Sequence, residues 1–296
     1  MCDKNTYKIG GAARYYIEPQ SVEDVMAALS FAKAQNIPFF ILGKGSNLLI
    51  SDLGYSGLVV NNSTHMCRIS LNDNILEAQA GAMLNTVVNL SIENGWAGLQ
   101  ELAGIPGTVG GAVIMNAGAF NSCIADTLQS VTYYDSNTSE IITAKASELN
   151  LGYRTSSLYG KETVILDARF KFSVSDSTGR LREIKQEILS KRKLKQPLEY
   201  PNCGSVFKRP PGNFAGTLIE KCGLKGFRYK GVEVSLKHAN FIINRDNGCA
   251  SDVRHLIITI QKTVFDQTGI LLEPEVIFVG DYEEPLFNPK NSGEKR

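Results

Sequence analysis

Residues 104–120 read GIPGTVGGAVIMNAGAF, and this stretch decides how the rest of the chain is interpreted. It holds five glycines, and its polar side chains, those of Thr108 and Asn116, are short. Glycine adopts positive φ at no steric cost and has no Cβ, so this backbone is suited to pressing closely against another group. Two interpretations stay open: a small-residue packing interface between a loop and a helix, or a loop whose N–H groups face an anionic cofactor.

A second glycine-rich segment, GKGSNLL at 43–49, follows the apolar run IPFFILG. It matches neither the dinucleotide-binding pattern G-x-G-x-x-G nor the phosphate-binding loop G-x-x-x-x-G-K-[ST]. Its glycines, serine and asparagine can still turn N–H groups and small polar side chains toward a phosphate, although an ordinary strand-to-loop turn is the alternative. Two such loops about 60 residues apart favour a diphosphate that both of them hold.

Composition narrows the class of protein. A chain of 296 residues is long enough for two domains or three small ones. The net charge of +1 gives no reason to expect a nucleic-acid or membrane-surface role. The six cysteines form no C-x-x-C pair, and no H-E-x-x-H or Cys/His cluster occurs, so the sequence predicts reduced thiols and no metal site. The N-terminus lacks an apolar targeting region and no apolar run reaches about 18 residues, which predicts a cytoplasmic protein.

Periodicity predicts mixed helices and strands. Apolar spacing indicates a helix that begins after Ser21 as its N-cap, and another that begins at Ser251 as a cap and ends at Gly269. Further helices are expected at 84–94 and 181–196, and strands at 37–43, 57–61, 128–134, 139–143 and 163–173. Residues 3–19 are expected to form two short strands with a Gly10–Gly11 turn between them, the second ended by Pro19. Residues 72–74 read as a hairpin tip, and residues 175–180 as a linker.

Three polar residues stand in unusual sequence surroundings. Arg154 lies in GYRTSSLYG with no acidic neighbour, and it is either a surface arginine or a fork for a carboxylate or enolate oxygen. Ser205 lies in a glycine-flanked turn, CGSVFK, and is either a turn serine or a positioned proton donor. Glu275 enters the apolar strand EPEVIFVG, and it is either an exposed strand start or a half-buried carboxyl with a raised pKa.

Seven segments in this order resemble the bacterial UDP-N-acetylenolpyruvoylglucosamine reductases: NTYKIGGAA, GKGSNLL, GIPGTVGGAVIMNAGAF, GYR, CGSVFK, KHANFIIN and EPEV. The resemblance covers about residues 3–280. Only 51 positions separate Arg154 from Ser205 (205 − 154), which is similar to the shorter subtype of the family that lacks an inserted tyrosine loop. The chain departs from the family pattern at Arg209, Lys230 and Val232, in the part that the family uses for its substrate.

The resemblance implies an α+β fold with a two-part FAD-binding domain of the vanillyl-alcohol-oxidase-like type and a smaller α+β substrate-binding domain. The expected parts are FAD-binding subdomains at 3–60 and 61–174, a UDP-sugar domain at 175–281 and a polar tail at 282–296. The implied partner is a small UDP-sugar, with no nucleic acid and no membrane, and the chain is expected to be a monomer.

The resemblance also implies the site residues. Arg154, Ser205 and Glu275 fall on the family's catalytic residues. The expected FAD-binding residues are Gly43, Gly45, Ser46, Asn47, Leu48, Gly107, Thr108, Gly110, Gly111, Asn116, Ala117 and Gly118. The expected substrate-binding residues are Lys208, Lys237, His238 and Asn240.

The implied reaction uses FAD as cofactor and NADPH as co-substrate. It reduces the enolpyruvyl ether of UDP-N-acetylglucosamine enolpyruvate to UDP-N-acetylmuramate, a step of peptidoglycan precursor synthesis. The alternative is another FAD-dependent oxidoreductase of the same cofactor fold, acting on an alcohol or a sugar. Such an enzyme would keep both glycine-rich loops but would not need Arg154, Ser205 and Glu275 together.

Overall fold

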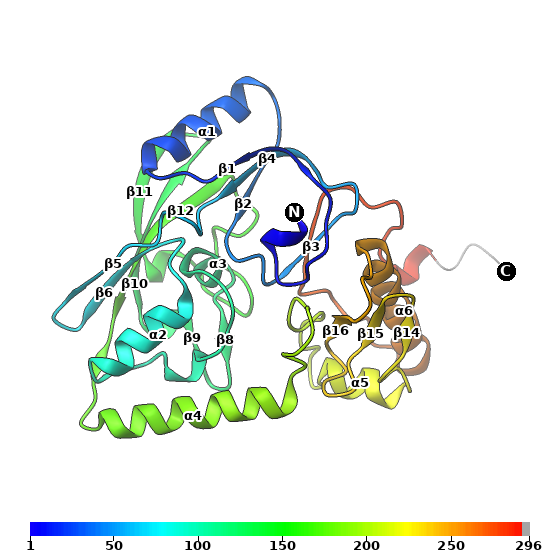
Figure 1. The fold of residues 1–296 in the computed structure, drawn as a ribbon. Helices are drawn as coiled ribbons and strands as arrows, with labels where there is room; N and C mark the ends of the chain where they lie inside the picture. The colour runs from blue at the N-terminus through cyan, green and yellow to red at the C-terminus, as the bar shows by residue number, and fades with distance from the viewer. Residues whose placement is uncertain (292–296) are drawn as a thin grey trace. The chain divides into compact units, whose positions relative to one another are not determined.

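The computed structural model describes residues 1–291, and the chain folds into two compact units (Figure 1). The large unit comprises residues 14–44 and 56–192, and the terminal unit comprises residues 1–13, 45–55 and the chain from Lys193 onward. Both units contain helices and strands, which confirms the predicted α+β class. The domain boundaries expected at 60/61 and 174/175 stay a prediction, and residues 292–296 of the expected tail lie outside the described part.

Two sheets form the frame of the large unit. One has the strand order β1-β4-β2 with β2 and β4 parallel, and the other is antiparallel with the order β11-β10-β12-β6-β5. Asp73, at a φ of 51°, forms the tight β5–β6 turn and confirms the predicted hairpin. The strands are β1 (Ala13–Ile17), β2 (Phe39–Leu42), β4 (Tyr55–Asn61), β5 (Ile69–Asn72), β6 (Ile75–Gln79), β10 (Leu128–Asp135), β11 (Glu140–Lys145) and β12 (Thr163–Lys171).

Helix α1 (Val22–Ala34) begins as its sequence predicts. The N–H of Asp24 donates to the Ser21 hydroxyl at 3.2 Å and the N–H of Ser21 donates to the Asp24 carboxylate at 3.2 Å, which is a capping box. Val25 and Leu29 of this helix share one buried cluster with residues of β4, β10 and β12. The helix therefore connects the two sheets through a common core.

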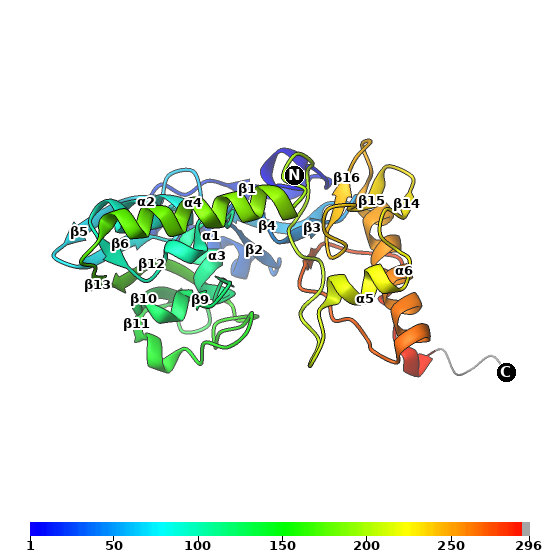
Figure 2. The ribbon, with the colours of Figure 1, turned by 90° about the horizontal axis from the view of Figure 1, so that it is seen from below.

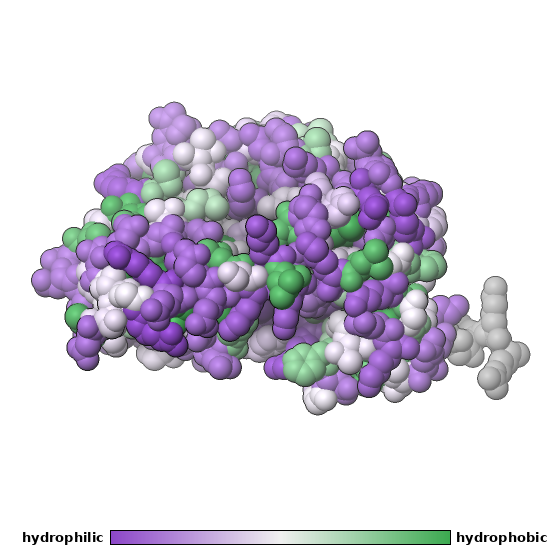
Figure 3. All heavy atoms as spheres, turned by 60° about the horizontal axis from the view of Figure 1, so that its bottom comes forward, coloured by the Kyte–Doolittle hydropathy of each residue, from purple (hydrophilic) through white to green (hydrophobic). Residues whose placement is uncertain are grey.

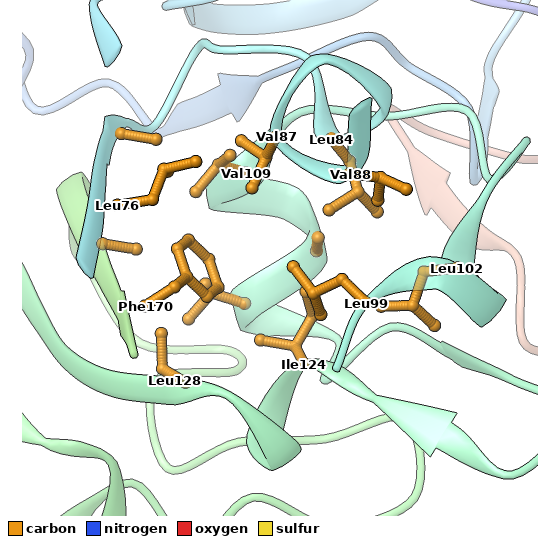
Figure 4. Packing of buried hydrophobic residues seen from close by; sticks show 14 of the residues in the cluster. Leu76, Leu84, Val87, Val88, Leu99, Leu102, Val109, Ile124, Leu128 and Phe170 are labelled. Atoms are coloured by element: carbon orange, nitrogen blue, oxygen red, sulfur yellow. The ribbon is translucent and has the colours of Figure 1, made fainter. Parts of the chain in front are cut away.

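The largest core lies on the other side of the five-stranded sheet. It is formed by β6, β10 and β12 with α2 (Leu84–Glu93), α3 (Val109–Ile114) and one side of α4 (Thr178–Lys195). Figure 4 shows Val109 of α3 packed among Leu84, Val87 and Val88 of α2 and Phe170 of β12. This packing fixes the glycine-rich stretch, because α3 is its central part.

Short elements complete the large unit. Helix α4 is the long helix of Figures 1 and 2, and the face on which Figure 3 looks, where α4 lies, is mostly hydrophilic with scattered apolar patches. The remaining pieces are β7 (Trp96–Ala97), β8 (Gly118–Ala119), β9 (Ser122–Cys123), β13 (Ser173–Val174), and the 3-10 helices η2 (Gln100–Leu102), η3 (Ile124–Asp126) and η4 (Ala146–Glu148).

The terminal unit has its own core, which contains Tyr7, Leu49, Phe207 and the apolar face of its long helix α6. An antiparallel sheet of order β14-β15-β16 and a parallel pair of β3 with β17 surround this core. The elements are β3 (Leu48–Ile50), α5 (Ala215–Lys221), β14 (Arg228–Tyr229), β15 (Val232–Val234), β16 (Ile242–Asn244), α6 (Ala250–Thr268), β17 (Ile277–Val279), η1 (Cys2–Lys4) and η5 (Pro289–Asn291). Within residues 1–291 no helix is both long and apolar enough to cross a membrane.

Of the two strands predicted within residues 3–19, the second is confirmed as β1, and the first, at 3–9, is wrong. Cys2–Lys4 forms a 3-10 helix instead, and the Asn5 side chain then closes a turn by donating to the carbonyls of Met1 at 2.9 Å and Ile9 at 2.7 Å. A side chain that bonds the local backbone competes with a strand ladder, which the β-forming side chains alone do not reveal.

Helix α6 ends at Gly269 as predicted, but its N-cap is Cys249 rather than Ser251. Cys249 forms a capping box with Asp252, in which the N–H of Cys249 donates to the Asp252 carboxylate at 3.2 Å, and a carboxylate from a distant part of the chain adds to this cap. Asp52 accepts hydrogen bonds from the N–H of Ala250 at 2.7 Å, and from the N–H and the hydroxyl of Ser251 at 2.9 Å each. Asp52 thus satisfies free N–H groups at the positive end of a 19-residue helix.

We expect the Asp52→Ala substitution to lower the free energy of unfolding by about 1–2 kcal/mol, the sum of a lost cap and a lost favourable charge at the helix N-terminus. Urea unfolding followed by circular dichroism measures this. The matched control is Asp281→Ala, an exposed aspartate of the same unit, which should stay within about 0.5 kcal/mol of wild type. Equal stability of the two variants would contradict this capping role.

Candidate active site

The glycine-rich stretch enters α3 through an irregular turn. The N–H groups of Val109 and Gly110 donate to the carbonyls of Ala82 and Ala80 at 2.8 Å each, so both are satisfied inside the large unit. The N–H groups of Gly107, Thr108 and Gly111 donate no hydrogen bond to residues 1–291. Within residues 107–111, these three N–H groups are therefore the ones that could still bond a cofactor.

Two of the predicted cofactor glycines are required by packing. A Cβ on Gly43 would lie 2.3 Å from the Thr108 hydroxyl oxygen, so the two glycine-rich segments meet at this point. A Cβ on Gly110 would lie 3.0 Å from the Cβ of Ala80 and 3.2 Å from its carbonyl oxygen. Small residues here let a strand-end loop and the start of α3 approach each other.

Gly118 and Gly111 differ in what surrounds them. A Cβ on Gly118 would lie 2.9 Å from the Cβ of Cys123, across the β8–β9 hairpin, so a larger residue there would displace the hairpin. A Cβ on Gly111 would meet only the Thr108 hydroxyl, at 3.7 Å, and Gly111 is exposed. Packing thus explains Gly43, Gly110 and Gly118, whereas Gly111 has an open side and an N–H without a hydrogen-bond partner in the described chain.

Arg154 occupies the tip of a tight turn that is tied to the end of α3. Its backbone is left-handed, with a φ of 56°, which is uncommon for a residue with a side chain. The turn is closed by the N–H of Gly152, which donates to the Thr155 carbonyl at 3.1 Å. The Asn116 amide donates to the Gly152 carbonyl at 3.0 Å and accepts from the N–H of Ala125 at 3.0 Å. Asn116 therefore links the arginine turn to the glycine-rich stretch.

A second bond holds the same turn. The Ser156 hydroxyl donates to the Ile114 carbonyl, in the last turn of α3, at 2.9 Å. The Arg154 guanidinium carbon lies 5.1 Å from the centre of the Tyr153 ring, within cation–π distance. Strained backbone conformations persist where the surrounding structure holds them and are frequent at functional sites.

The terminal unit carries the other glycine-rich segment. Gly45 has a φ of 65°, and a Cβ there would lie 2.7 Å from the Cβ of Asn5, so it too is fixed by packing. Next to it, the Asn47 amide donates to the Glu275 carbonyl at 3.0 Å, and the Asn47 carbonyl accepts from the N–H of Ile277 at 2.9 Å. Ser46 is half-buried, and Leu48 starts β3 opposite β17.

A backbone hydrogen bond joins the segment that contains Ser205 to the segment that contains Glu275. The carbonyl of Val206 accepts from the N–H of Glu275 at 2.7 Å and from the N–H of Val276 at 3.3 Å. Ser205 precedes Val206, follows Gly204 at a φ of 81°, and is half-buried. No residue in the described part of the chain hydrogen-bonds the Ser205 hydroxyl. The predicted proton donor thus lies next to a residue, Val206, whose backbone bonds the predicted acid.

A buried thiol lies behind this pair. Burial raises the pKa of Cys203 to about 12, and the nearby Glu275 charge adds to the increase. Tyr7 is fully buried, and its hydroxyl donates to the Ile242 carbonyl at 2.7 Å. Burial and the neighbouring Cys203 raise its pKa as well. Both groups stay protonated at neutral pH, so neither adds charge behind Ser205.

The predicted substrate-binding lysines form ion pairs on the surface of the terminal unit. The Lys208 ammonium pairs with Glu273, and the Lys237 ammonium lies 2.9 Å from Glu199. Burial lowers the pKa of His238, and its Nδ1 accepts from the N–H of Asn240 at 3.2 Å, so the neutral ring carries its proton on Nε2.

The structure therefore groups the predicted residues into two sets. Gly43, residues 107–118 and Arg154 belong to the large unit, whereas residues 45–48, Ser205, Glu275 and the predicted substrate-binding residues belong to the terminal unit. Among residues 1–291 no group of three or more His, Cys, Asp or Glu side chains is arranged to hold a metal ion.

Two structural roles were missed by the sequence analysis. Asp52 caps α6, and the Asn240 amide bonds the backbone of Phe207 rather than pointing away from the protein. Asn240 stands between Ala239 and the apolar residues 241–243, and that was the signal for a buried, hydrogen-bonded amide. No local pattern marks Asp52 as a partner of residues about 200 positions away.

Comparison with known proteins identifies the class first. Residues 13–145 match the profile of an FAD-binding domain, and the large unit holds most of this range. The open side and unpaired N–H of Gly111 fit an anionic group of such a cofactor. The chain is thus an FAD-containing oxidoreductase with a separate C-terminal domain.

The family follows from the rest of the chain. Residues 196–279 match the C-terminal domain of UDP-N-acetylenolpyruvoylglucosamine reductase. The protein of that name from Caldicellulosiruptor bescii is 43% identical over 98% of this chain and 92% of its own length, and the one from Clostridium tetani is 42% identical over 95% and 91%. The crystal structure of the Thermus caldophilus enzyme superimposes with a TM-score of 0.79 at 31% identity, covering 94% of this chain and 96% of that one. The chain belongs to the UDP-N-acetylenolpyruvoylglucosamine reductase family.

Proposed function

We propose that this chain uses NADPH and FAD to reduce the enolpyruvyl ether of UDP-N-acetylglucosamine enolpyruvate, forming UDP-N-acetylmuramate for peptidoglycan synthesis. Family membership over nearly the full length supports the reaction class. The observation that carries the assignment to this chain is the backbone contact between the Ser205 and Glu275 segments, in which the Val206 carbonyl accepts from the Glu275 N–H, because it holds the proposed proton donor and the proposed acid on adjoining segments. We further propose that the enzyme acts as a cytoplasmic monomer.

The bound FAD supplies the hydride equivalent, taken from NADPH, to the CH₂ carbon of the enolpyruvyl group. Negative charge then develops on the neighbouring carbon and its carboxylate. The protein's task is to hold this charge and to deliver a proton to that carbon. A cofactor group near Gly111 would accept a hydrogen bond from its N–H, with Thr108 and Gly43 setting the shape of the cradle.

Arg154 would hold the developing enolate oxygen. A guanidinium presents two parallel N–H groups to a carboxylate, and a donor fixed in place before reaction loses no energy to reorientation. The hydrogen bonds from Asn116 and Ser156 supply this rigidity, because they hold the turn on both sides of Arg154.

Ser205 would deliver the proton. A hydroxyl is a weak acid, but an enolate carbon is a strong base, and proton transfer is feasible once the two atoms are held in contact. The Ser205 hydroxyl is not engaged by another described residue, so it can turn toward a substrate without breaking a bond. Lys208, Lys237 and His238 are proposed to contact the UDP-sugar.

Glu275 would stand beside the developing charge, where it assists only as the protonated acid. We expect Glu275→Gln to preserve sugar binding within about tenfold, because the neutral amide keeps the size and the donor of the protonated acid. Turnover of the enolpyruvyl sugar should fall if the Glu275 carboxyl proton takes part in its reduction. Titration calorimetry with the enolpyruvyl sugar measures binding, and stopped-flow absorbance measures turnover. A much larger loss of binding would make Glu275 a recognition or structural residue.

The proposed function is tested by following NADPH oxidation in the presence of the enolpyruvyl sugar, with mass analysis of the product. The account predicts sugar-dependent NADPH consumption and a product two hydrogens heavier. A related flavoprotein acting on an alcohol or a simple sugar would instead reduce its flavin with that compound and ignore the enolpyruvyl sugar. That result would overturn the proposal.

A further inference from the structure

The Asn240 side chain makes a two-point contact with one residue of the Ser205 segment. Its Oδ1 accepts from the N–H of Phe207 at 3.0 Å, and its Nδ2 donates to the Phe207 carbonyl at 2.9 Å. Its own backbone carbonyl accepts from the N–H of Val206 at 2.8 Å. Asn240 is only 7% exposed, and both functional ends of its amide are used within the protein.

The side-chain amide of Asn240 takes the place of a backbone peptide group that would pair with Phe207 in a regular strand. Before Asn240 the chain bends, since the N–H of Phe241 donates to the His238 carbonyl at 2.9 Å and the N–H of Asn240 donates to His238 Nδ1. The backbone of Asn240 therefore reaches Val206 but not Phe207. A primary amide has the donor and the acceptor of a peptide group and can take its place.

The opposite side of the same segment carries Glu275. The carbonyl of Val206 bonds the N–H of Glu275, the N–H of Lys208 donates to the Glu273 carbonyl at 2.8 Å, and Phe207 pairs with Pro274. Proline has no N–H, so this side offers Phe207 no donor from its partner residue. Residues 206–208 are thus held between Asn240 on one side and residues 273–275 on the other.

We propose that Asn240 is a positioning residue for proton transfer, acting through residues 206–207 to fix Ser205 relative to Glu275. This role rests on the proposed function, because it requires Ser205 to be the donor. It replaces substrate binding as the main task of Asn240, since the amide has no free end to offer a ligand. Loss of the amide would leave both buried backbone groups of Phe207 unpaired and free the Ser205 segment to shift.

The sharpest test is Asn240→Asp. A carboxylate accepts from the Phe207 N–H but repels the Phe207 carbonyl, whereas the protonated acid again offers one donor and one acceptor. Burial raises the pKa of such a carboxyl, so the protonated form should appear on mild acidification. The charged and titratable groups around the site are His238, which is neutral, and Lys208, Glu273 and Glu275.

Two rates are measured by stopped flow on one preparation of holoenzyme: flavin reduction by NADPH, and flavin reoxidation by the enolpyruvyl sugar. At about pH 8 we expect Asn240→Asp to slow the sugar step by roughly 10- to 100-fold, the effect of displacing a reacting group by up to about 1 Å. The NADPH step should stay near wild type. At about pH 5–6 the sugar step should recover toward the wild-type rate, and Asn240→Ala should show no recovery.

Asn244→Asp is the matched control. Asn244 is 8% exposed in the neighbouring β16, and its amide also bonds backbone groups, but those of Tyr7 and Gly248. The Asn244→Asp variant should have a melting temperature that depends on pH. Its ratio of flavin reduction by NADPH to flavin reoxidation by the sugar should equal that of the wild type. If Asn240→Asp behaves like this control, or slows both steps equally, Asn240 is only structural and the proposal is wrong. A wild-type enzyme that does not respond to the sugar overturns the proposed function itself, and this role with it.

Discussion

Ser205→Ala is expected to slow the sugar-dependent step by roughly 10³-fold, within the range of about 10²–10⁴ that a positioned general acid contributes. The NADPH-dependent step should be nearly unchanged, because Ser205 lies outside residues 13–145, which match the FAD-binding profile. Stopped-flow absorbance of the bound flavin reports both steps in one experiment. The variant should fold normally, since the Ser205 hydroxyl has no partner in the described chain.

Ser205→Cys gives the matched comparison. A thiol keeps a proton to donate at nearly the same position, so this variant should retain more sugar-dependent activity than Ser205→Ala. An equal loss of both half-reactions in Ser205→Ala would instead mean that the residue supports the cofactor site or the fold, and the proton-donor role would have to be abandoned.

Arg154→Ala is expected to lower kcat/KM for the sugar by about 10²–10³-fold, or roughly 3–4 kcal/mol of transition-state stabilisation, the usual effect of losing one preorganised donor to a developing oxyanion. Steady-state kinetics at saturating NADPH measures it. Arg154→Lys should recover only part of the loss, because an ammonium lacks the planar fork that binds a carboxylate through two parallel bonds.

The left-handed backbone of Arg154 calls for a further control. Arg154→Gly removes the side chain without strain, since glycine adopts positive φ freely. If the role lies in the guanidinium, the glycine and alanine variants should lose similar activity while the glycine variant melts at the same or a higher temperature. An active glycine variant would show that only the turn conformation matters.

The sequence predicted those parts of the fold whose causes are local. The Ser21–Asp24 capping box, the tight turn at Asp73 and the helix end at Gly269 all depend on residues within a few positions of one another. The predicted cap of α6 was wrong because Cys249 and Asp252 form the capping box instead, and Asp52, from about 200 residues away, also accepts from the first N–H groups. The strand expected at 3–9 was wrong because the Asn5 side chain closes a turn there.

In the candidate site, too, local features could be predicted from the sequence and long-range contacts could not. Sequence order indicated which glycine-rich segments matter, but not why their glycines are needed, since the atoms that crowd Gly43 and Gly118 belong to Thr108 and Cys123. The pairing of Asn47 with Glu275 joins residues 228 positions apart. Contacts of this kind depend on the register of distant segments, which periodicity in one chain does not contain.

The central claim is that this chain passes reducing equivalents from NADPH to an enolpyruvyl sugar through FAD. The most direct test is anaerobic: the purified flavoprotein is reduced with one equivalent of NADPH, and UDP-N-acetylglucosamine enolpyruvate is then added while the visible flavin absorbance is recorded. The account predicts rapid return of the oxidised flavin spectrum with one UDP-N-acetylmuramate formed per flavin. A flavin that stays reduced after the sugar is added would contradict it.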